Sequence, residues 1–396
     1  MPELLRSPRV ALMRAIVDRV GVGRLSVTLP SGEHIVAGDA ASAVKATVTI
    51  HRWRALSRLL VGGATGFAEA YIEGEWSSPD LPAFLELAAR NADHFASRAS
   101  GLMPMRLINR LRHRSRTNPR RGSRRNIAAH YDLGNAFYAL WLDRGMTYSS
   151  ALYQRDEDSL EQAQADKYRR AIALMELEGG ERVLEIGCGW GGLAETLARE
   201  RDCRVTAITL SREQLTHAAD RLRGAGLAER AEIRFADYRE IRGTYDRIVS
   251  IEMLEAVGEE HWPTYFATLR DRLAEGGVAV LQAITIADAR FAAYRRRADF
   301  IQSQIFPGGM LPSPAALREQ IERAGLVLAS LETFGRSYAR TLADWQTRFQ
   351  RAWPEIAAMG FAPRFKRKWE YYLAYCEAGF RAASIDVGLY RIEKPR

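Results

Sequence analysis

The chain has 396 residues, of which 47% are hydrophobic and 27% are charged, a composition that is typical of a globular protein and excludes a disordered or fibrous one. Its length favours two or three domains. No apolar stretch is long enough to span a bilayer, and the N-terminal MPELLRSPRVALMR lacks the apolar core of a signal peptide, so we expect a cytoplasmic location. The net charge of +9 favours an anionic partner, either a nucleic acid or a membrane surface.

The cysteines and histidines show no pattern of a disulfide framework or a metal site. Cys188, Cys203 and Cys376 have neither paired nor metal-type spacing, and the seven histidines are scattered along the chain. We therefore expect no disulfide and no bound metal.

Residues 1–100 are predicted to form a small α+β domain that interacts with lipid. Two runs of alternating and β-branched residues, 25–29 and 46–50, predict strands. Helices are predicted at 53–60 and 81–89, and a pair of glycines at positions 62 and 63 predicts a turn after the first of them.

A strongly basic segment follows this domain. Between residues 105 and 125 there are nine arginines, one histidine and no acidic residue, and a proline and a glycine interrupt any regular pattern, so we place a linker at 101–125. Leu107, Ile108 and Leu111 fall on one helical face with arginines around them. Such a segment can lie on an anionic bilayer, and a solvated linker is the alternative.

Residues 126–396 are predicted to form a catalytic domain in which helices and strands alternate. This alternation predicts an α/β fold with a doubly wound, mostly parallel, Rossmann-like sheet. Ligands of such sheets bind at the carboxyl ends of the strands. The predicted strands are 182–186, 204–208, 232–235, 245–251 and 278–284, and the predicted helices are 160–177, 192–199 and 212–222.

A glycine-rich turn, EIGCGWGG at 185–192, follows the first of these strands. Gly187, Gly189 and Gly191 occupy every second position, which lets a ligand pack against the backbone, and the spacing fits E-x-G-x-G-x-G rather than the dinucleotide pattern. The turn therefore favours a nucleoside over a pyrophosphate and indicates a site for S-adenosylmethionine. Without a following lysine and Ser/Thr it is not a P-loop, and a plain βα turn is the alternative.

Polar residues follow two later strands at the same edge of the predicted sheet. Thr209 and Leu210 end the second strand, with Gln214 shortly after, and Asp237 follows the third. Asp237 is well placed to accept a hydrogen bond from an adenine amino group. An ordinary helix N-cap and an ordinary loop residue are the alternatives.

Seven sequence blocks carry a resemblance to a known family: NIAAHYDLGNAFY at 126–138, LD at 142–143, MTYSSALY at 146–153, the glycine turn, FPGGMLPS at 306–313, WPEI at 353–356 and, in the N-terminal domain, EAYIEGEW at 69–76. In these blocks the chain resembles the cyclopropane-fatty-acyl-phospholipid synthases and their mycolic acid methyltransferase relatives. The resemblance covers nearly the whole chain.

The resemblance implies a class I methyltransferase fold and transfer of the methyl group of S-adenosylmethionine to the double bond of an unsaturated acyl chain in a membrane phospholipid. It also suggests a homodimer. From the basic segment at 101–125 we expect the protein to be peripheral on the inner face of an anionic membrane. We expect the donor to contact Tyr148, Ser149, Glu185, Gly187, Gly189, Gly191, Thr209, Leu210, Gln214, Asp237 and Tyr238.

An isolated alkene is a weak nucleophile, so it has to be held in line with the sulfonium methyl in a site that excludes water. Methyl transfer leaves a carbocation, which aromatic faces can stabilise without trapping it covalently. Tyr148, Phe334 and Tyr338 are the candidates for this role, with core packing as the alternative reading.

A cyclopropane ring forms only if a base removes a proton from the transferred methyl group. In the resembled family a bicarbonate does this, held by a cysteine, a glutamate, a histidine and a tyrosine, and the matching positions here are Ser150, Glu255, Gln282 and Tyr338. Because two of the four differ, either bicarbonate still binds through altered hydrogen bonds or the product is a methyl- or methylene-branched chain. Of the neighbouring glutamates Glu252 and Glu255, we favour Glu255.

Two other functions are consistent with parts of the sequence. In a nucleic-acid methyltransferase the arginines would neutralise phosphates, but no nucleic-acid module or Asn-Pro-Pro-Tyr motif accompanies them, so we expect no nucleic-acid partner. A catalytically silent lipid-binding protein would keep the fold without turnover, and the intact donor motifs disfavour it.

Overall fold

The computed structural model describes residues 7–96 and 133–396, and these divide into two compact units. The first unit is made of residues 7–96, 296–300 and 353–384, and the second of 133–295, 301–352 and 385–396. The predicted basic linker lies outside the described residues, so the domain boundaries stay a prediction. Within the described ranges, no helix is long and apolar enough to cross a bilayer.

A four-stranded sheet with the order β2-β1-β3-β4 forms the centre of the first unit. Its strands are β1 (Arg24–Thr28), β2 (His34–Gly38), β3 (Lys45–Ile50) and β4 (Trp76–Ser77). β1 and β3 confirm the two predicted strands and pair in parallel, whereas β2 was not predicted. Alternate side chains of β1 and β3 are buried, as the period of two in their sequences requires.

The helices of the first unit are α1 (Pro8–Val17), α2 (Arg54–Ile72), α3 (Leu81–Arg90), α4 (Ala92–Ala96) and α16 (Pro363–Arg381). The predicted glycine turn is instead a kink within α2, where Gly63 has φ 59° and ψ −144°. Although α16 lies far along the chain, it packs in this unit. Arg367 on α16 donates to the carbonyl of Ile72 at 2.9 Å, and the rings of Tyr71 and Tyr371 lie 5.5 Å apart.

The second unit contains a seven-stranded sheet with the order β10-β11-β9-β8-β5-β6-β7. Its strands are β5 (Glu181–Ile186), β6 (Cys203–Thr209), β7 (Ala231–Phe235), β8 (Tyr245–Ile251), β9 (Leu273–Ile286), β10 (Val327–Thr333) and β11 (Ile385–Glu393). β5 to β9 run parallel, and β11 is antiparallel to both of its neighbours. This arrangement confirms the predicted α/β fold with a mostly parallel sheet.

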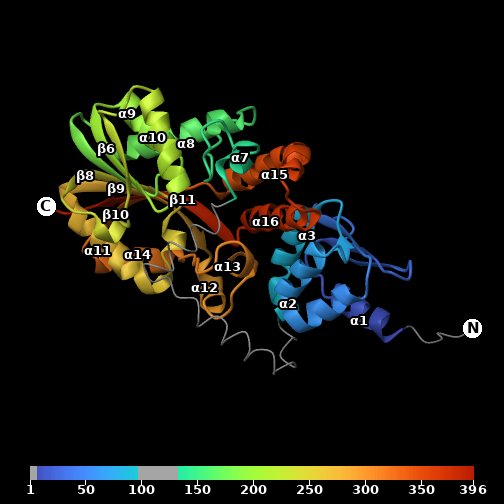
Figure 1. Ribbon diagram of the computed structural model, residues 1–396. Helices are drawn as coiled ribbons and strands as arrows, with labels where there is room; N and C mark the ends of the chain where they lie inside the picture. Colours follow the sequence, from blue (N-terminus) through green and yellow to red (C-terminus); the bar gives the residue numbers. More distant parts are fainter. Residues whose placement is uncertain (1–6, 97–132) are drawn as a thin grey trace, which may run out of the picture. The chain divides into compact units, whose positions relative to one another are not determined.

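Helices cover both faces of this sheet (Figure 1). One face packs against α8 (Leu160–Met175), α9 (Gly192–Glu200) and α10 (Arg212–Gly224), and the other against α11 (Trp262–Arg272) and α14 (Pro314–Arg323). The remaining helices are α7 (Asn135–Ala139), α12 (Asp288–Tyr294), α13 (Phe300–Gln304) and α15 (Gly335–Ala358). α8 begins with a capping box, because the Ser159 side chain accepts the N–H of Gln162 and the Gln162 side chain accepts the N–H of Ser159.

Candidate active site

The glycine-rich turn joins the end of β5 to the start of α9. Gly187, Gly189 and Gly191 have φ angles of 84°, 52° and 83°, in the left-handed region that side chains disfavour. A Cβ at Gly191 would come 2.9 Å from the Cβ of Ala218, and one at Gly187 would come 3.0 Å from the Cγ of Met253. A Cβ at Gly189 would meet no atom within 4 Å. Two of the glycines therefore permit close packing, and the third leaves space beside the turn.

A pocket opens beside this turn, at the carboxyl ends of β5 and β6, where α/β sheets bind ligands. Most residues predicted to contact the donor line it: Tyr148, Ser149, Glu185, Gly187, Gly189, Thr209, Leu210, Gln214 and Tyr238. Gly191 and Asp237 are not among the lining residues. The fold thus brings together, in one hollow, residues that the sequence analysis selected from distant parts of the chain.

Asp237 is buried and forms a two-pronged ion pair with its neighbour Arg239. The Nε and one Nη of Arg239 donate to the two carboxylate oxygens at 2.8 and 2.6 Å. Such paired, charge-assisted hydrogen bonds are among the stronger ones in proteins. An adenine amino group would have to share the carboxylate with Arg239, and the adenine contact stays a prediction.

Glu185 lies near the end of β5 and is buried against the pocket. Burial raises the pKa of its carboxyl group to about 8, and the nearby charge of Lys167 partly opposes this rise. Among the described residues, no hydrogen-bond partner reaches its Oε2. A buried polar atom without a partner is destabilising, so a polar group of a bound ligand would satisfy it.

Tyr148 and Ser149 are presented to the pocket by a loop that is held from two sides. The Asp143 carboxylate accepts two backbone N–H groups of the loop at 2.7 and 2.8 Å. From α8, Gln164 donates to the carbonyl of Ser149 at 2.8 Å, and Lys167 Nζ donates to Ser149 Oγ at 2.7 Å. The position of the Ser149 hydroxyl is therefore set by a helix as well as by its own loop.

The predicted residues Ser150, Gln282 and Tyr338 come together around the carboxylate of Glu252. Its Oε1 accepts the Ser150 N–H at 2.8 Å and Gln282 Nε2 at 2.7 Å, and its Oε2 accepts the Tyr338 hydroxyl at 2.6 Å. Glu252 is partly buried and also lines the donor pocket. Burial raises the pKa of Glu252, while the hydrogen bonds from Tyr338 and Ser150 oppose the rise.

The backbone of Glu252 is strained. It follows β8 directly and has a φ of 50°, a conformation that costs a residue with a side chain about 1–2 kcal/mol. Its N–H donates to the carbonyl of Gln282 at 2.8 Å, so β9 helps to hold it there. Strain of this kind persists only where the surrounding structure holds the residue in place, and strained residues cluster at functional sites.

Glu255, the glutamate favoured from the sequence, lies outside this cluster. Its Oε1 accepts the N–H of Ile284 at 2.5 Å, and it is not among the residues that line the pocket. Burial and the charge of Glu252 raise its pKa to about 8, so it is mostly neutral at pH 7. A catalytic role for Glu255 stays a prediction. The sequence did carry one signal for Glu252, its place directly after a strand, at the ligand-binding edge of the sheet.

The site can be tested for its fit to bicarbonate. The backbone of Ser150 and the side chains of Gln282 and Tyr338 already donate to a carboxylate that belongs to the chain. A second anion at this place would meet a like charge in a partly desolvated setting, which is unfavourable. The residues present therefore do not fit a bound bicarbonate.

Aromatic rings surround the approach to this cluster. The Tyr148 ring lies 5.4 Å from that of Trp345 and 5.6 Å from that of Trp141, and Tyr338 lies 6.1 Å from Trp345. Phe334 instead packs against the core between the sheet and α8 to α10. Tyr148 and Tyr338 thus belong to one aromatic group, while Phe334 is a core residue in its packing.

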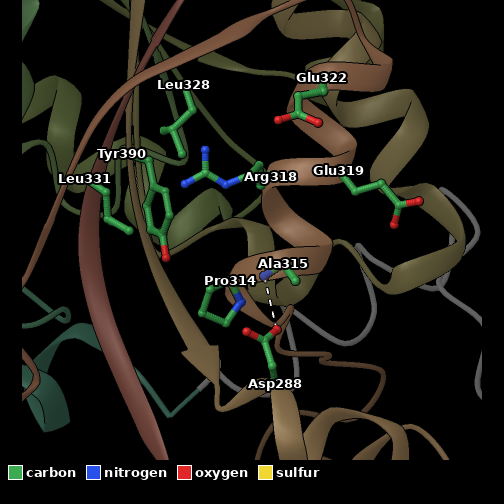
Figure 2. Close-up of a pocket in the computed structure, with 9 residues that line it drawn as sticks. All are labelled: Asp288, Pro314, Ala315, Arg318, Glu319, Glu322, Leu328, Leu331 and Tyr390. Atoms are coloured by element: carbon green, nitrogen blue, oxygen red, sulfur yellow. Dashed lines mark hydrogen bonds between the residues drawn. The ribbon is translucent and has the colours of Figure 1, made fainter.

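A second hollow lies between α14 and strands β10 and β11 (Figure 2). Arg318 extends across it towards Tyr390, and the carboxylates of Asp288, Glu319 and Glu322 lie around its rim. None of the predicted site residues lines it. In the described part of the chain, no group of three or more His, Cys, Asp or Glu residues could hold a metal ion. The predicted site residues therefore lie at or beside the pocket at the glycine turn and not at this second hollow.

Comparison with known proteins gives consistent matches. Residues 118–389 match the family model described as mycolic acid cyclopropane synthetase. A tuberculostearic acid methyltransferase of Mycobacterium tuberculosis is 39% identical over 96% of this chain and 92% of that protein. A cyclopropane-fatty-acyl-phospholipid synthase of Escherichia coli is 35% identical over 83% of each chain.

Solved structures show the same relationship for the fold. The structure of a mycolic acid cyclopropane synthase complexed with SAH and CTAB is similar with a TM-score of 0.64 and 29% identity, and the similarity covers 68% of this chain and 98% of that one.

Proposed function

This chain belongs to the mycolic acid cyclopropane synthetase family, and we propose that it methylates the double bond of an unsaturated acyl chain in a membrane phospholipid and gives a methyl- or methylene-branched product. It is an S-adenosylmethionine-dependent lipid methyltransferase with a class I methyltransferase fold. The alkene acceptor and the branched product are the proposed part. The Glu252 cluster and the 39% identity to a tuberculostearic acid methyltransferase support it.

When bound, S-adenosylmethionine supplies an electrophilic methyl group at the glycine turn. Gly189 leaves room for a ligand against the backbone, and Glu185 offers a carboxyl oxygen that lacks a partner among the described residues. Tyr148 and Ser149 line the pocket from their loop. Together these residues hold the donor in one orientation and exclude water, which a weak alkene nucleophile requires.

Methyl transfer uses the π electron pair of the alkene to form a carbon–carbon bond while the carbon–sulfur bond to the methyl group breaks, and it leaves a carbocation on the neighbouring carbon. A hydride shift from the methylated carbon moves the positive charge onto that carbon. Loss of a proton from the methyl group then gives a methylene branch, and loss of a proton from a chain carbon gives a methyl-branched alkene. The Tyr338 hydroxyl donates to the Glu252 carboxylate, Tyr148 lines the same pocket as Glu252, and Trp345 packs against both tyrosine rings. A cation over such a face gains about 2 kcal/mol or more when water is excluded. These rings therefore lower the energy of the cation without forming a covalent bond to it.

Glu252 is the base in this proposal, and its placement is the observation that carries it. The carboxylate has about four lone-pair sites, of which three accept the hydrogen bonds described above, so one remains for a proton. A carbocation is a very strong acid, so a weak base suffices if it is correctly placed. Because the chain supplies this carboxylate itself, the reaction needs no bound bicarbonate.

The proposal is tested by following the methyl group. Vesicles of phospholipid with monounsaturated acyl chains are incubated with the protein and with donor that carries a deuterated methyl group, and the acyl chains are analysed by gas chromatography and mass spectrometry. We expect label in a branched chain. Label in a ring would refute the branched product, and no label in any acyl chain would refute the alkene acceptor. Vesicles with saturated chains are the matched control.

We also propose that the protein acts as a homodimer on the inner face of an anionic membrane, without a nucleic-acid partner. The net charge of +9 and the arginine-rich segment 105–125, which lies outside the described residues, support the membrane attachment. Retention on anionic vesicles and on oligonucleotides, compared at increasing salt, tests the choice of partner. Light scattering after gel filtration tests the dimer.

A further inference from the structure

Lys167 is a fully buried lysine on α8, beside the donor pocket. A buried ammonium group is strongly destabilising unless hydrogen bonds and opposite charges compensate it. Its Nζ donates to Ser149 Oγ at 2.7 Å and lies 4.5 Å from the centre of the Tyr168 ring. Because burial of a charge is costly, the groups around this ammonium group indicate what role it has.

Three acidic side chains from different elements favour the charged form of this ammonium group when they are ionised. Glu252 follows β8, Asp143 lies in the loop that presents Ser149, and Glu185 lies on β5. Burial lowers the pKa of Lys167 to about 8, and the three carboxylates oppose this fall in the order just given, Glu252 most strongly. Geometry agrees with this, because Lys167 donates to Ser149 and the N–H of the next residue, Ser150, donates to the Glu252 carboxylate. The ammonium group therefore lies close to the proposed base, to the loop and to the donor pocket.

We propose that Lys167 is a positioning residue for both halves of the reaction: its ammonium holds the Ser149 hydroxyl against the methyl donor and is the counter-charge of the Glu252 carboxylate. The second half of this statement rests on the proposed function, in which Glu252 removes a proton. The first half concerns donor binding alone. The same buried ammonium group therefore acts on the donor pocket, through Ser149, and on the proposed base, Glu252.

The charges that face Glu252 fix the direction of the effect. Lys167 favours its ionised form, Glu255 disfavours it when ionised, and the Tyr338 hydroxyl stabilises it by hydrogen bonding. Loss of the Lys167 charge therefore raises the pKa of Glu252. Because the base acts only when deprotonated, the acid limb of the pH–rate profile then moves to higher pH.

The experiment compares Lys167→Met and Lys167→Arg with Lys368→Met, which removes a half-buried lysine from the other unit. For each variant we measure the dissociation constant of S-adenosylhomocysteine by calorimetry and kcat/KM for labelled methyl transfer from pH 5 to pH 9. We expect Lys167→Met to weaken binding about tenfold and to move the acid limb up by about one pH unit. Lys167→Arg should keep the acid limb in place, and Lys368→Met should change neither quantity.

An acid limb that does not move in Lys167→Met would overturn the counter-charge to Glu252, and binding within twofold of the original would overturn the hold on Ser149. If Lys167→Met does not fold, Lys167→Gln replaces it, because the amide can still donate to Ser149 but carries no charge. That variant should shift the limb and keep most of the donor affinity, and an unmoved limb again overturns the proposal. Calorimetry needs no acyl substrate, so it reports on the donor half even if no acyl chain is labelled and the proposed function fails.

Discussion

Replacing Glu252 by glutamine removes the proposed base and changes little else. The amide has the same shape, and its carbonyl oxygen can take the place of Oε1, where it still accepts the Ser150 N–H and Gln282 Nε2. Its NH2 group then faces the Tyr338 hydroxyl, which can rotate to accept. The free energy of unfolding should therefore change by about 1 kcal/mol or less.

The rate should fall much further than the stability. A positioned general base contributes on the order of 10²–10⁴-fold, so we expect Glu252→Gln to lower kcat for methyl incorporation by at least a hundredfold. Binding of S-adenosylhomocysteine should stay within a few-fold, because none of the hydrogen bonds lost or changed belongs to the glycine turn. The assay uses initial rates on monounsaturated vesicles, with urea denaturation and calorimetry on the same preparations.

A variant that keeps kcat within twofold of the original would refute the reasoning. The same substitution at Glu255 decides between the two neighbouring carboxylates, because a base at Glu255 predicts the larger loss there. Glu377→Gln, which changes a buried carboxyl group of the other unit, controls for the general effect of neutralising a buried glutamate.

Four further substitutions test the site and its surroundings. Glu252→Gly relieves the strain of the left-handed backbone and leaves the position of the carboxylate empty. Activity should be lost but partly restored by millimolar formate or bicarbonate. Failure of both anions to restore activity would contradict the assignment of Glu252 as the base. Gly189→Ala should weaken the binding of S-adenosylhomocysteine, measured by calorimetry. In Gly191→Ala the new Cβ would meet Ala218 at 2.9 Å, so the free energy of unfolding, measured in urea, should fall by about 1–3 kcal/mol. The pKa of Glu255 is raised to about 8, so the folded state binds more protons than the unfolded state between about pH 5 and 8, and stability falls as pH rises through that range. Glu255→Gln should flatten this fall by up to about 1.4 kcal/mol per pH unit, and an unchanged slope in urea midpoints would contradict the burial argument.

The parts of the fold that the sequence predicted well are those set by local pattern. The alternation of buried strands and amphipathic helices from residue 160 onwards placed β5 to β8 and α8 to α10 close to their observed bounds. β11 was not predicted, because its partner β9 lies about a hundred residues earlier and no local signal specifies such a pairing. The kink in α2 was predicted as a turn, because two adjacent glycines favour either outcome and packing decides between them.

The same distinction applies to the site. The donor residues follow strand ends, so topology alone places most of them at one edge of the sheet. The choice between Glu252 and Glu255 depends on the direction in which each side chain points. A spacing of three positions in the sequence does not determine that direction. Glu252 makes its contacts with Ser150, Gln282 and Tyr338 from a left-handed backbone, and no sequence pattern predicts a positive φ at a glutamate.

The place of β11 in the sheet has a consequence for synthesis on the ribosome. β10 and β9 do not touch each other, since β11 lies between them and pairs with both. The ribosome therefore completes β10 long before the strand that attaches it, because 52 positions separate Thr333 from Ile385. At about 5–20 residues per second this interval lasts about 3–10 s. During that time the apolar side chains of β9 and β10 that pack with α14 lack their central neighbour, so this part of the core closes only after β11 has been made.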